Sequence, residues 1–482
     1  MARSTTLNVG VIGAAQLTVV VVNQLVIIVL AHYLKPSDFG IFAVCQVIIS
    51  LALTVSSFGL EEAAIQTKGD PEREVVTAAS LRLVLALASA AVVFISAPYI
   101  THYFAIENAT LALQVLGTSF VLLGLAFVPR VWLKRELKFG LIALSSIVNL
   151  ALWSAMALIL GILGAGFWTL IIAFLIGTIG TSVTVWVLRP SRIQFRLDKT
   201  EAKGLMRFGA YIMATNLLIF FLMNLDKVAI AKELGSDQLG VYWIAFQYGT
   251  QPTFFITSVI VSVIFPTYAN IASDLNILKE KHRRVLRYLA LVSFPIGVGL
   301  ASVSPSFIIS LFGSRWSGAV APLSLLCIFG IMSSITSTSG SIYMSTNNAR
   351  QMFKQNIVMI VPFVVLLLPA VKYFGLTGVA WLFVGVIFVQ LVWVTMSVSR
   401  ILSYSPLDDL RHVYAIPVAA STAMGLVVVA VWLILGTSII TLMVQIPVGF
   451  AVYGAVVTAA TRGEIIQEMR SILGTILRRG KA

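Results

Sequence analysis

Residues 30–42 read LAHYLKPSDFGIF, and residues 230–242 read IAKELGSDQLGVY. The two stretches align without gaps at an offset of 200 positions, with an alanine, a leucine and a glycine in common and conservative exchanges between them. Each stretch lies between two long apolar runs, so the same kind of polar connection occurs twice in one chain. This match predicts an internal repeat of about 200 residues, a pattern that is typical of helical transporters.

Apolar runs flank both stretches and continue along the whole chain. A helix rises 1.5 Å per residue, so a hydrocarbon core of about 30 Å requires about 20 residues. Most runs reach this length and none alternates with a period of two, which excludes a β-barrel. The sequence therefore predicts an all-α polytopic membrane protein with about 14 spanning helices. The runs are 9–31, 39–60, 78–98, 110–129, 141–161, 166–188, 209–231, 240–268, 288–312, 319–343, 356–372, 375–398, 413–435 and 438–461.

The composition agrees with a lipid environment. Apolar residues make up 59% of the 482 residues and charged residues only 11%, and the mean hydropathy is +0.98. A water-soluble fold could not bury so much apolar surface. Cys45 and Cys327 lie inside apolar runs, where we expect small core residues and neither a disulfide nor a metal site. The first run is longer than the apolar region of a signal peptide and is interpreted as a retained helix.

Basic residues alternate between the two sides of the predicted bundle. The N-terminus, every second loop and the C-terminal tail together hold 28 of the 33 lysines and arginines. The positive-inside rule places this set in the cytoplasm, with both termini there and an even number of spans. The net charge of +14 therefore indicates contact with anionic membrane lipid, and no nucleic-acid partner is expected.

A second, weaker similarity between the two halves of the sequence supports the repeat. Glycines and Trp168 open the sixth run, as glycines and Trp381 open the twelfth. We therefore expect an N-terminal lobe over residues 1–200, a C-terminal lobe over 201–400, and two appended helices with a cytoplasmic tail over 401–482. Parallel repeats imply a pseudo-two-fold axis along the membrane normal and a cavity between the two six-helix lobes.

At these residues the chain resembles the polysaccharide transporter (Wzx-type flippase) family of the multidrug/oligosaccharidyl-lipid/polysaccharide exporter superfamily. The resemblance implies a non-enzymatic transporter that flips undecaprenyl-pyrophosphate-linked oligosaccharides by alternating access between its lobes. It also implies a bacterial inner-membrane location, a role in exopolysaccharide, capsule or lipopolysaccharide synthesis, and a polysaccharide polymerase and chain-length regulator as partners. The stretches that carry it are residues 34–40, 59–61, 224–227, 234–242 and 265–266.

Charges inside spans cost about 2.5–3.5 kcal/mol each on insertion scales, so Asp226 and Lys227 in the seventh run are the first candidates for function. Adjacent helical residues point about 100° apart, so we do not expect the two to neutralise each other. Lys227 shares a helix face with Asn216 and Asn224. We expect this face to line the cavity, with Lys227 meeting a phosphate or acidic sugar. Asp226 would then bind H⁺ or Na⁺, or pair with a basic residue of another helix. The alternative is a structural ion pair with Lys227 extending to the interface.

Amide side chains are the next candidates. Asn23 in the first run, and Gln247 and Gln251 in the eighth, could bind sugar hydroxyls, although such amides also join helices as packing contacts.

Three further charged residues lie at the ends of spans. Arg82 lies just inside the third run, where it could bind the pyrophosphate at the cytoplasmic mouth or extend to the surface. Arg315 at an outer end could meet the product or anchor the interface. Glu61 and Glu62 are expected to pair with Arg73 or Arg82.

Two other functions remain open. An exporter of small cationic drugs would favour buried acidic residues, whereas the few charges of the outer half are mostly basic. A membrane-embedded polymerase or ligase commonly needs a large external loop, and the predicted external loops have only about 5 to 15 residues. The chain contains no Walker-type glycine-rich loop, so direct coupling to ATP is not expected, nor is any other cofactor.

Overall fold

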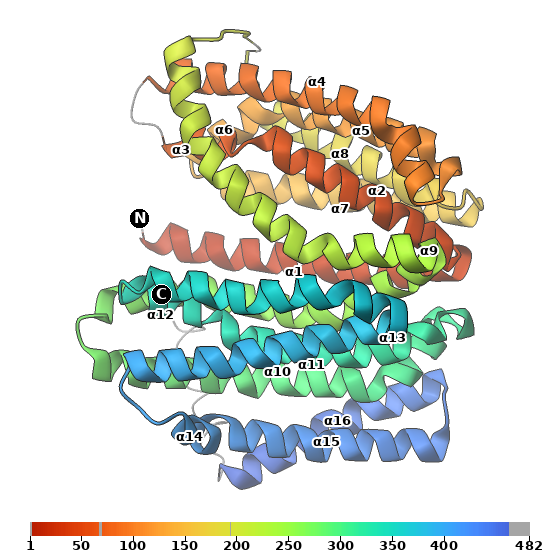
Figure 1. Ribbon diagram of the computed structural model, residues 1–482, viewed down its shortest axis with the longest axis vertical. Helices are drawn as coiled ribbons and strands as arrows, with labels where there is room; N and C mark the ends of the chain where they lie inside the picture. The colour runs from red at the N-terminus through yellow and green to blue at the C-terminus, as the bar shows by residue number, and fades with distance from the viewer. Residues whose placement is uncertain (1, 67–69, 193, 462–482) are drawn as a thin grey trace. The chain divides into compact units, whose positions relative to one another are not determined.

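A computed structural model describes residues 2–66, 70–192 and 194–461, and within these ranges the chain forms helices and no strand (Figure 1). The chain divides into two compact units, Met1–Gly240 and Val241–Ala482. The predicted all-α fold class is confirmed. The lobe boundaries predicted from the repeat stay a prediction, because compactness and internal repetition divide a chain by different criteria.

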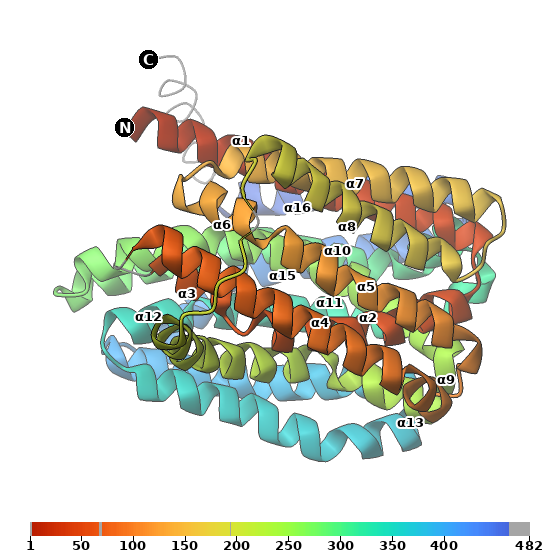
Figure 2. The ribbon, with the colours of Figure 1, turned by 90° about the horizontal axis from the view of Figure 1, so that it is seen from above.

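The first unit consists of long helices joined by short connections. Neighbours along the chain pack as antiparallel pairs, α4 with α5 and α7 with α8, and α1 packs on α7 (Figure 2). The elements are α1 (Ala2–Tyr33), α2 (Pro36–Ser57), α3 (Leu60–Gln66), α4 (Pro71–Tyr103), η1 (Glu107–Ala109), α5 (Thr110–Leu125), α6 (Phe127–Arg135), α7 (Phe139–Ile162), α8 (Trp168–Leu188) and the first part of α9 (Lys199–Ile271).

The second unit contains the rest of α9 and the helices that follow it. Its main packing pairs are α10 with α11, α11 with α13, α10 with α15, and α15 with α16. The elements are α10 (Leu275–Phe312), η2 (Ser314–Ala319), α11 (Val320–Ser337), α12 (Ser339–Ser345), α13 (Ala349–Ile401), α14 (Pro406–Asp409), the π-helical turn η3 (Leu410–Tyr414), α15 (Ala415–Leu435) and α16 (Ile439–Ala460).

Two of these helices are each interrupted at one glycine. Gly235 in α9 has φ 83° and Gly375 in α13 has φ 60°, conformations that L side chains disfavour. The chain changes direction at these residues, so α9 and α13 each supply two spanning segments. Counted this way, the helices agree with the predicted number of about 14.

The exposed surface of the helices is apolar. Eleven helices are long and apolar enough to cross a membrane among the residues that the structure describes. Large side chains such as Ile95, Val187 and Phe450 are 69%, 72% and 75% exposed. Such a surface is stable in contact with lipid chains and not with water, so the chain is a multi-pass membrane protein. Cys45 and Cys327 are free and buried, as predicted.

Polar caps fix where several helices begin. Asp38 Oδ2 accepts a hydrogen bond from the Lys35 amide at 2.8 Å in the first turn of α2. Asp274 Oδ1 accepts two bonds, from the amides of Asn276 and Ile277, at the start of α10. The caps satisfy backbone amides of the first turn that the helix itself leaves open.

Candidate functional site

The charged pair of the seventh predicted span lies in the first part of α9. Asp226 is fully buried, and the Lys227 side chain is 12% exposed. The Lys227 ammonium lies 3.6 Å from Asp226 Oδ1 and also donates to the carbonyl of Met223. The expectation that adjacent residues cannot neutralise each other was therefore wrong, because the flexible lysine stem reaches back along its own helix.

Apolar residues surround the Lys227 stem. A cavity of about 10 Å³ is lined by this lysine together with Val44 and Val47 of α2, and Phe104. Asn224, one turn earlier, donates from its side-chain amide to the carbonyl of Phe220 at 2.9 Å. The face that was predicted to be polar is therefore partly apolar, and the Asn224 donor is engaged within its own helix.

The other residues of the first unit that were predicted to bind substrate are distant in sequence from Asp226 and Lys227. Asn216 in α9 and Asn23 in α1 are both partly exposed. Arg82 in α4 is only 7% exposed and donates from Nη1 to Ser56 Oγ of α2 at 2.7 Å. Its guanidinium therefore does not extend to the surface, which was the alternative interpretation.

Other charged groups lie near Arg82. Glu61 and Arg130 are close enough to act on its charge, the first favourably and the second unfavourably. Glu61 is salt-bridged to Lys134 at 2.7 Å, and Arg73 to Asp70 at 3.2 Å. The expected pairing of Glu61 with Arg73 was therefore wrong, because α6 brings a nearer lysine to this carboxylate.

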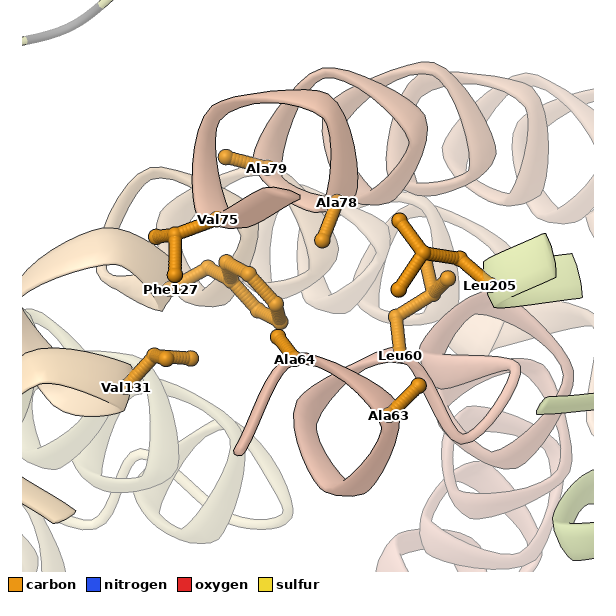
Figure 3. Close-up of a cluster of buried hydrophobic side chains, with 9 residues drawn as sticks. All are labelled: Leu60, Ala63, Ala64, Val75, Ala78, Ala79, Phe127, Val131 and Leu205. Carbon is orange, nitrogen blue, oxygen red and sulfur yellow. The ribbon is translucent and has the colours of Figure 1, made fainter. Parts of the chain in front are cut away.

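An apolar cluster holds this end of the first unit together (Figure 3). The short helix α3 packs between α4, α6 and the start of α9, and the Arg135 guanidinium donates to the carbonyl of Ala64 at 2.7 Å. The cluster fixes the positions from which Arg82 and Glu61 project. Its members are Leu60, Ala63, Ala64, Val75, Ala78, Ala79, Phe127, Val131 and Leu205.

In the second unit the predicted amides lie on α9 one turn apart. Gln247 and Gln251 are both partly buried, and between them Tyr248 packs against Phe307 and Phe312 with ring centroids 5.3 and 5.2 Å away. Arg315 is exposed in η2. Amides beside aromatic faces suit sugar recognition, and they equally suit helix packing.

A large apolar groove in the second unit was not predicted. Its volume is about 490 Å³, and it is lined by α10, α15 and α16. Gln445 and Tyr453 are the two lining residues with polar side-chain groups, and both are engaged with carbonyls, of Val428 at 3.0 Å and Leu291 at 2.8 Å. Sequence periodicity could not find this groove, because three separate helices contribute its walls.

A polar cluster of the second unit, built around the buried carboxylate of Asp409, was also missed. Arg283 donates from Nε to Asp409 Oδ1 at 2.7 Å, lies 3.4 Å from Asp408, and stacks on the Tyr404 ring at 4.6 Å. Burial raises the pKa of Tyr404, and the Asp409 carboxylate raises it further. Arg283 and Asp409 are 126 residues apart in the chain, so no local sequence pattern indicates that they pair.

No metal site is apparent where the side chains are described: three His, Cys, Asp or Glu residues do not gather there. The charged clusters can hold anions or protons through hydrogen bonds and Coulomb attraction, and the groove can hold an apolar chain.

Comparison with known proteins gives a consistent result. A model of the family described as "Polysaccharide biosynthesis protein" matches residues 29–321. The lipopolysaccharide biosynthesis protein WzxC of Escherichia coli (strain K12) is 27% identical over 441 residues, 88% of this chain and 84% of that protein. The teichuronic acid biosynthesis protein TuaB of Bacillus subtilis (strain 168) is 25% identical over 339 residues, 69% of each chain.

Solved structures share the fold. The lipid II flippase MurJ in an inward closed conformation superimposes with a TM-score of 0.76 at 14% identity, covering 94% of this chain and 99% of that one. An inward-facing multidrug resistance transporter of the MATE family gives 0.61 at 17% identity, covering 82% and 99%. At such identities the likeness establishes the arrangement of the helices alone.

Proposed function

Because the chain belongs to the polysaccharide biosynthesis protein family, we propose that it flips lipid-linked oligosaccharides across the bacterial inner membrane. The repeat unit would be carried on undecaprenyl pyrophosphate and used for exopolysaccharide, capsule or lipopolysaccharide synthesis. The names of the relatives WzxC, TuaB and the succinoglycan biosynthesis transport protein ExoT of Rhizobium meliloti (strain 1021) support a polymer of this kind. A polysaccharide polymerase and a chain-length regulator would then act on the product.

The observation that carries this proposal is the apolar groove between α10, α15 and α16. A polyprenyl chain gains nothing by entering a polar cavity, whereas a groove with almost wholly apolar walls offers it close packing. The lipid tail would stay in the groove while the sugars cross the membrane along a separate polar path. A small cationic drug does not need such a groove.

The headgroup would be met by buried basic residues. The described bond to Ser56 uses one of the five N–H donors of Arg82, so further donors can face a pyrophosphate. Lys227 would meet the phosphate or an acidic sugar during transport, and Asp226 would carry H⁺ or Na⁺. Both termini would lie in the cytoplasm, and the lobes over 1–200 and 201–400 would alternate access to the two sides.

The test is made in a deletion strain, by scoring the leaflet in which lipid-linked oligosaccharides accumulate. The strain is complemented with wild type, Asp226→Asn or Lys227→Ala. We expect accumulation on the cytoplasmic face that only wild type cures, with all variants inserted at equal amounts. Repeat units that already face outward but stay unpolymerised would refute a flippase and support a polymerase-like role.

The groove is tested separately with a pair of substitutions in α16. Ile446 lines the groove, whereas Met443 lies on the same helix, is 67% exposed and is not part of the lining. Ile446→Trp should fill the groove and slow flipping, and Met443→Trp should not. Equal rates for the two variants would show that the groove does not hold the lipid.

A further inference from the structure

An open pocket lies where α13 ends, and it shares no lining residue with the apolar groove of α10, α15 and α16. Its volume is about 640 Å³, and we call it the α13 pocket. Its polar lining residues are Ser399, Arg400, Ser403, Tyr404 and Ser405. Hydroxyl groups and a guanidinium are donors with which proteins bind phosphate groups. The lining therefore indicates a site for an anion.

The turn that ends α13 shapes this pocket. The Leu402 amide donates to the Val398 carbonyl at 2.9 Å, and the Tyr404 amide donates to the Ser399 carbonyl at 3.0 Å. Ser403, which lies between the two donors, has φ 52° at a position where glycine is usual. Both carbonyl groups are therefore bonded within the helix end, and the hydroxyl groups of the turn are left to face a ligand.

The donors of the α13 pocket are available for a ligand. Within the described residues, the Arg400 guanidinium forms no ion pair, and the hydroxyl groups of Ser403 and Ser405 have no protein partner. The two carboxylates of the neighbouring polar cluster both contact Arg283, and neither lines the pocket. An anion in the pocket would meet a guanidinium and hydroxyl groups, with no carboxylate in the lining to oppose it.

An apolar face of α13 leads from the pocket into the membrane. Met396 lines the pocket, Val392 and Val389 follow on the same helix face, and all three side chains are exposed. Val389 also lines an apolar groove of about 830 Å³ between the two segments of α13 that Gly375 separates. At 1.5 Å per residue, Arg400 and Val389 are about 16 Å apart along the helix. One leaflet has about the same hydrocarbon thickness, roughly half of 30 Å.

We propose that this end of α13 binds a glycerophospholipid. Its phosphate lies in the α13 pocket, and one acyl chain lies along Met396, Val392 and Val389. A phosphodiester carries a single negative charge, which matches the one guanidinium of the lining. An acyl chain has the length of one leaflet, whereas a polyprenyl chain would extend well beyond Val389. The site does not depend on flipping, and the proposed topology only assigns it to the cytoplasmic leaflet.

The bound lipid also affects stability. Tyr404 lines the α13 pocket, and the Arg283 guanidinium stacks on its ring at 4.6 Å. The headgroup therefore lies beside the polar cluster from which the appended helices begin. A ligand that binds only the folded chain raises the unfolding temperature, so phospholipid should protect the purified protein from heat.

The first experiment measures lipid affinity on the purified full chain in detergent. The probe is dioctanoyl phosphatidylglycerol, titrated by native mass spectrometry and by the shift in unfolding temperature. Arg400→Gln should weaken binding by roughly tenfold or more, because a charge-assisted hydrogen bond is lost. Arg350→Gln is the matched control, because Arg350 is exposed at the other end of α13 and does not line the pocket. Equal affinities for the two variants overturn the site.

Two further probes distinguish a phospholipid from a free phosphate. Glycerophosphoglycerol, the deacylated headgroup, should bind at least tenfold more weakly than the lipid. Equal affinity would show a site for phosphate alone and would overturn the lipid site.

The second probe locates the chain. Phosphatidylglycerol with a diazirine in its acyl chain should label residues 389–396, and Arg400→Gln should reduce this labelling by roughly tenfold. Labelling that is equal in wild type and Arg400→Gln overturns the proposed position of the chain. Neither probe requires transport, so a chain that moves no oligosaccharide would refute the proposed function and leave this test intact.

Discussion

Two carboxylates of the described residues, Asp226 and Asp409, are buried and paired with a basic side chain, and the two pairs are constructed differently. In the first part of α9, Lys227 reaches the carboxylate of its neighbour Asp226 and a carbonyl four residues earlier. In the second unit, Arg283 of α10 reaches Asp409, which is 126 residues further along the chain. The first set of contacts can form within one helix, whereas the second exists only when distant segments have packed.

The difference bears on what each pair can do. A pair formed within a helix can exchange partners while the helices stay in place, which suits a step of transport. A pair that joins α10 to the start of the π-helical turn fixes where the two appended helices begin, which suits stability. Removing one member of a buried pair leaves the other charge uncompensated, so the two pairs should fail in different ways.

The largest effect is expected for Arg283→Ala. It leaves Asp409, which is 2% exposed, buried without its partner, and we expect a loss of about 3–5 kcal/mol in the free energy of unfolding. The measurement is unfolding of the purified protein in detergent or lipid. Arg284→Ala is the control, because its pair with Glu280 is mostly exposed. Wild-type stability of Arg283→Ala would show that the cluster does not hold the appended helices.

Asp226→Asn should act on transport instead. The amide keeps the shape of the carboxylate and removes its charge, so flipping should fall roughly tenfold or more while unfolding changes less than for Arg283→Ala. Leaflet scoring and unfolding are measured on the same preparations. Glu233→Gln, an exposed carboxylate seven residues further on the same helix, is the control. If Asp226→Asn destabilises the protein as strongly as Arg283→Ala, the distinction between the two pairs is lost.

Arg82 tests an intermediate case, because it is a buried charge whose described hydrogen bond goes to a neutral group of another helix. Arg82→Ala should reduce flipping several-fold. Arg82→Lys should restore only part of it, because lysine keeps the charge without the planar fork. Ser56→Ala removes the hydrogen bond and keeps the charge, at a cost of about 1 kcal/mol in stability. Equal transport defects in Ser56→Ala and Arg82→Ala would indicate a packing role for the arginine.

The smallest effect is expected at Glu136, a partly exposed carboxylate that is paired with both Lys138 and Arg189. The hydrogen bond from Lys138 to Glu136, followed by that from Arg189, lowers the pKa of this carboxyl group. The stabilisation is therefore present above the ordinary carboxyl pKa and disappears as the pH falls through the lowered one. Glu136→Gln should be slightly less stable than wild type at neutral pH and equal to it in acid. A difference that grows in acid would contradict this sign.

The fold could be predicted where solvation alone decides. The apolar runs at 141–161 and 166–188 correspond to α7 and α8, because lipid leaves a backbone of this length little choice but a helix. Between the seventh and eighth runs the structure has a single break at Gly235 in place of a loop. One glycine with positive φ is enough to redirect the chain there. A hydropathy pattern does not predict such a break, because it carries no information on backbone conformation.

The candidate site could be predicted less well. Asp226 was singled out because a charge in an apolar run is costly, and the structure buries it completely with Lys227 3.6 Å away. Helical geometry predicted that Lys227 and Asp226 would not meet. That geometry describes the direction in which a side chain leaves the backbone, and it does not describe how far the four-carbon stem of lysine can bend. Arg82 was expected at the surface as one alternative, and the structure buries it against Ser56.

The sequence by itself determined the membrane environment, the helices and the repeat. These depend on local quantities: the apolar content of about 20 residues, the spacing of turns and the recurrence of a short motif. The tertiary structure alone decided that Gly40 and Gly240 lie in backbone contact, that Arg283 meets Asp409, and that three helices enclose an apolar groove. The physical reason is that lipid is as apolar as the helix faces it surrounds. Burial of apolar surface therefore does not select partners, and shape and scattered polar contacts decide which faces meet.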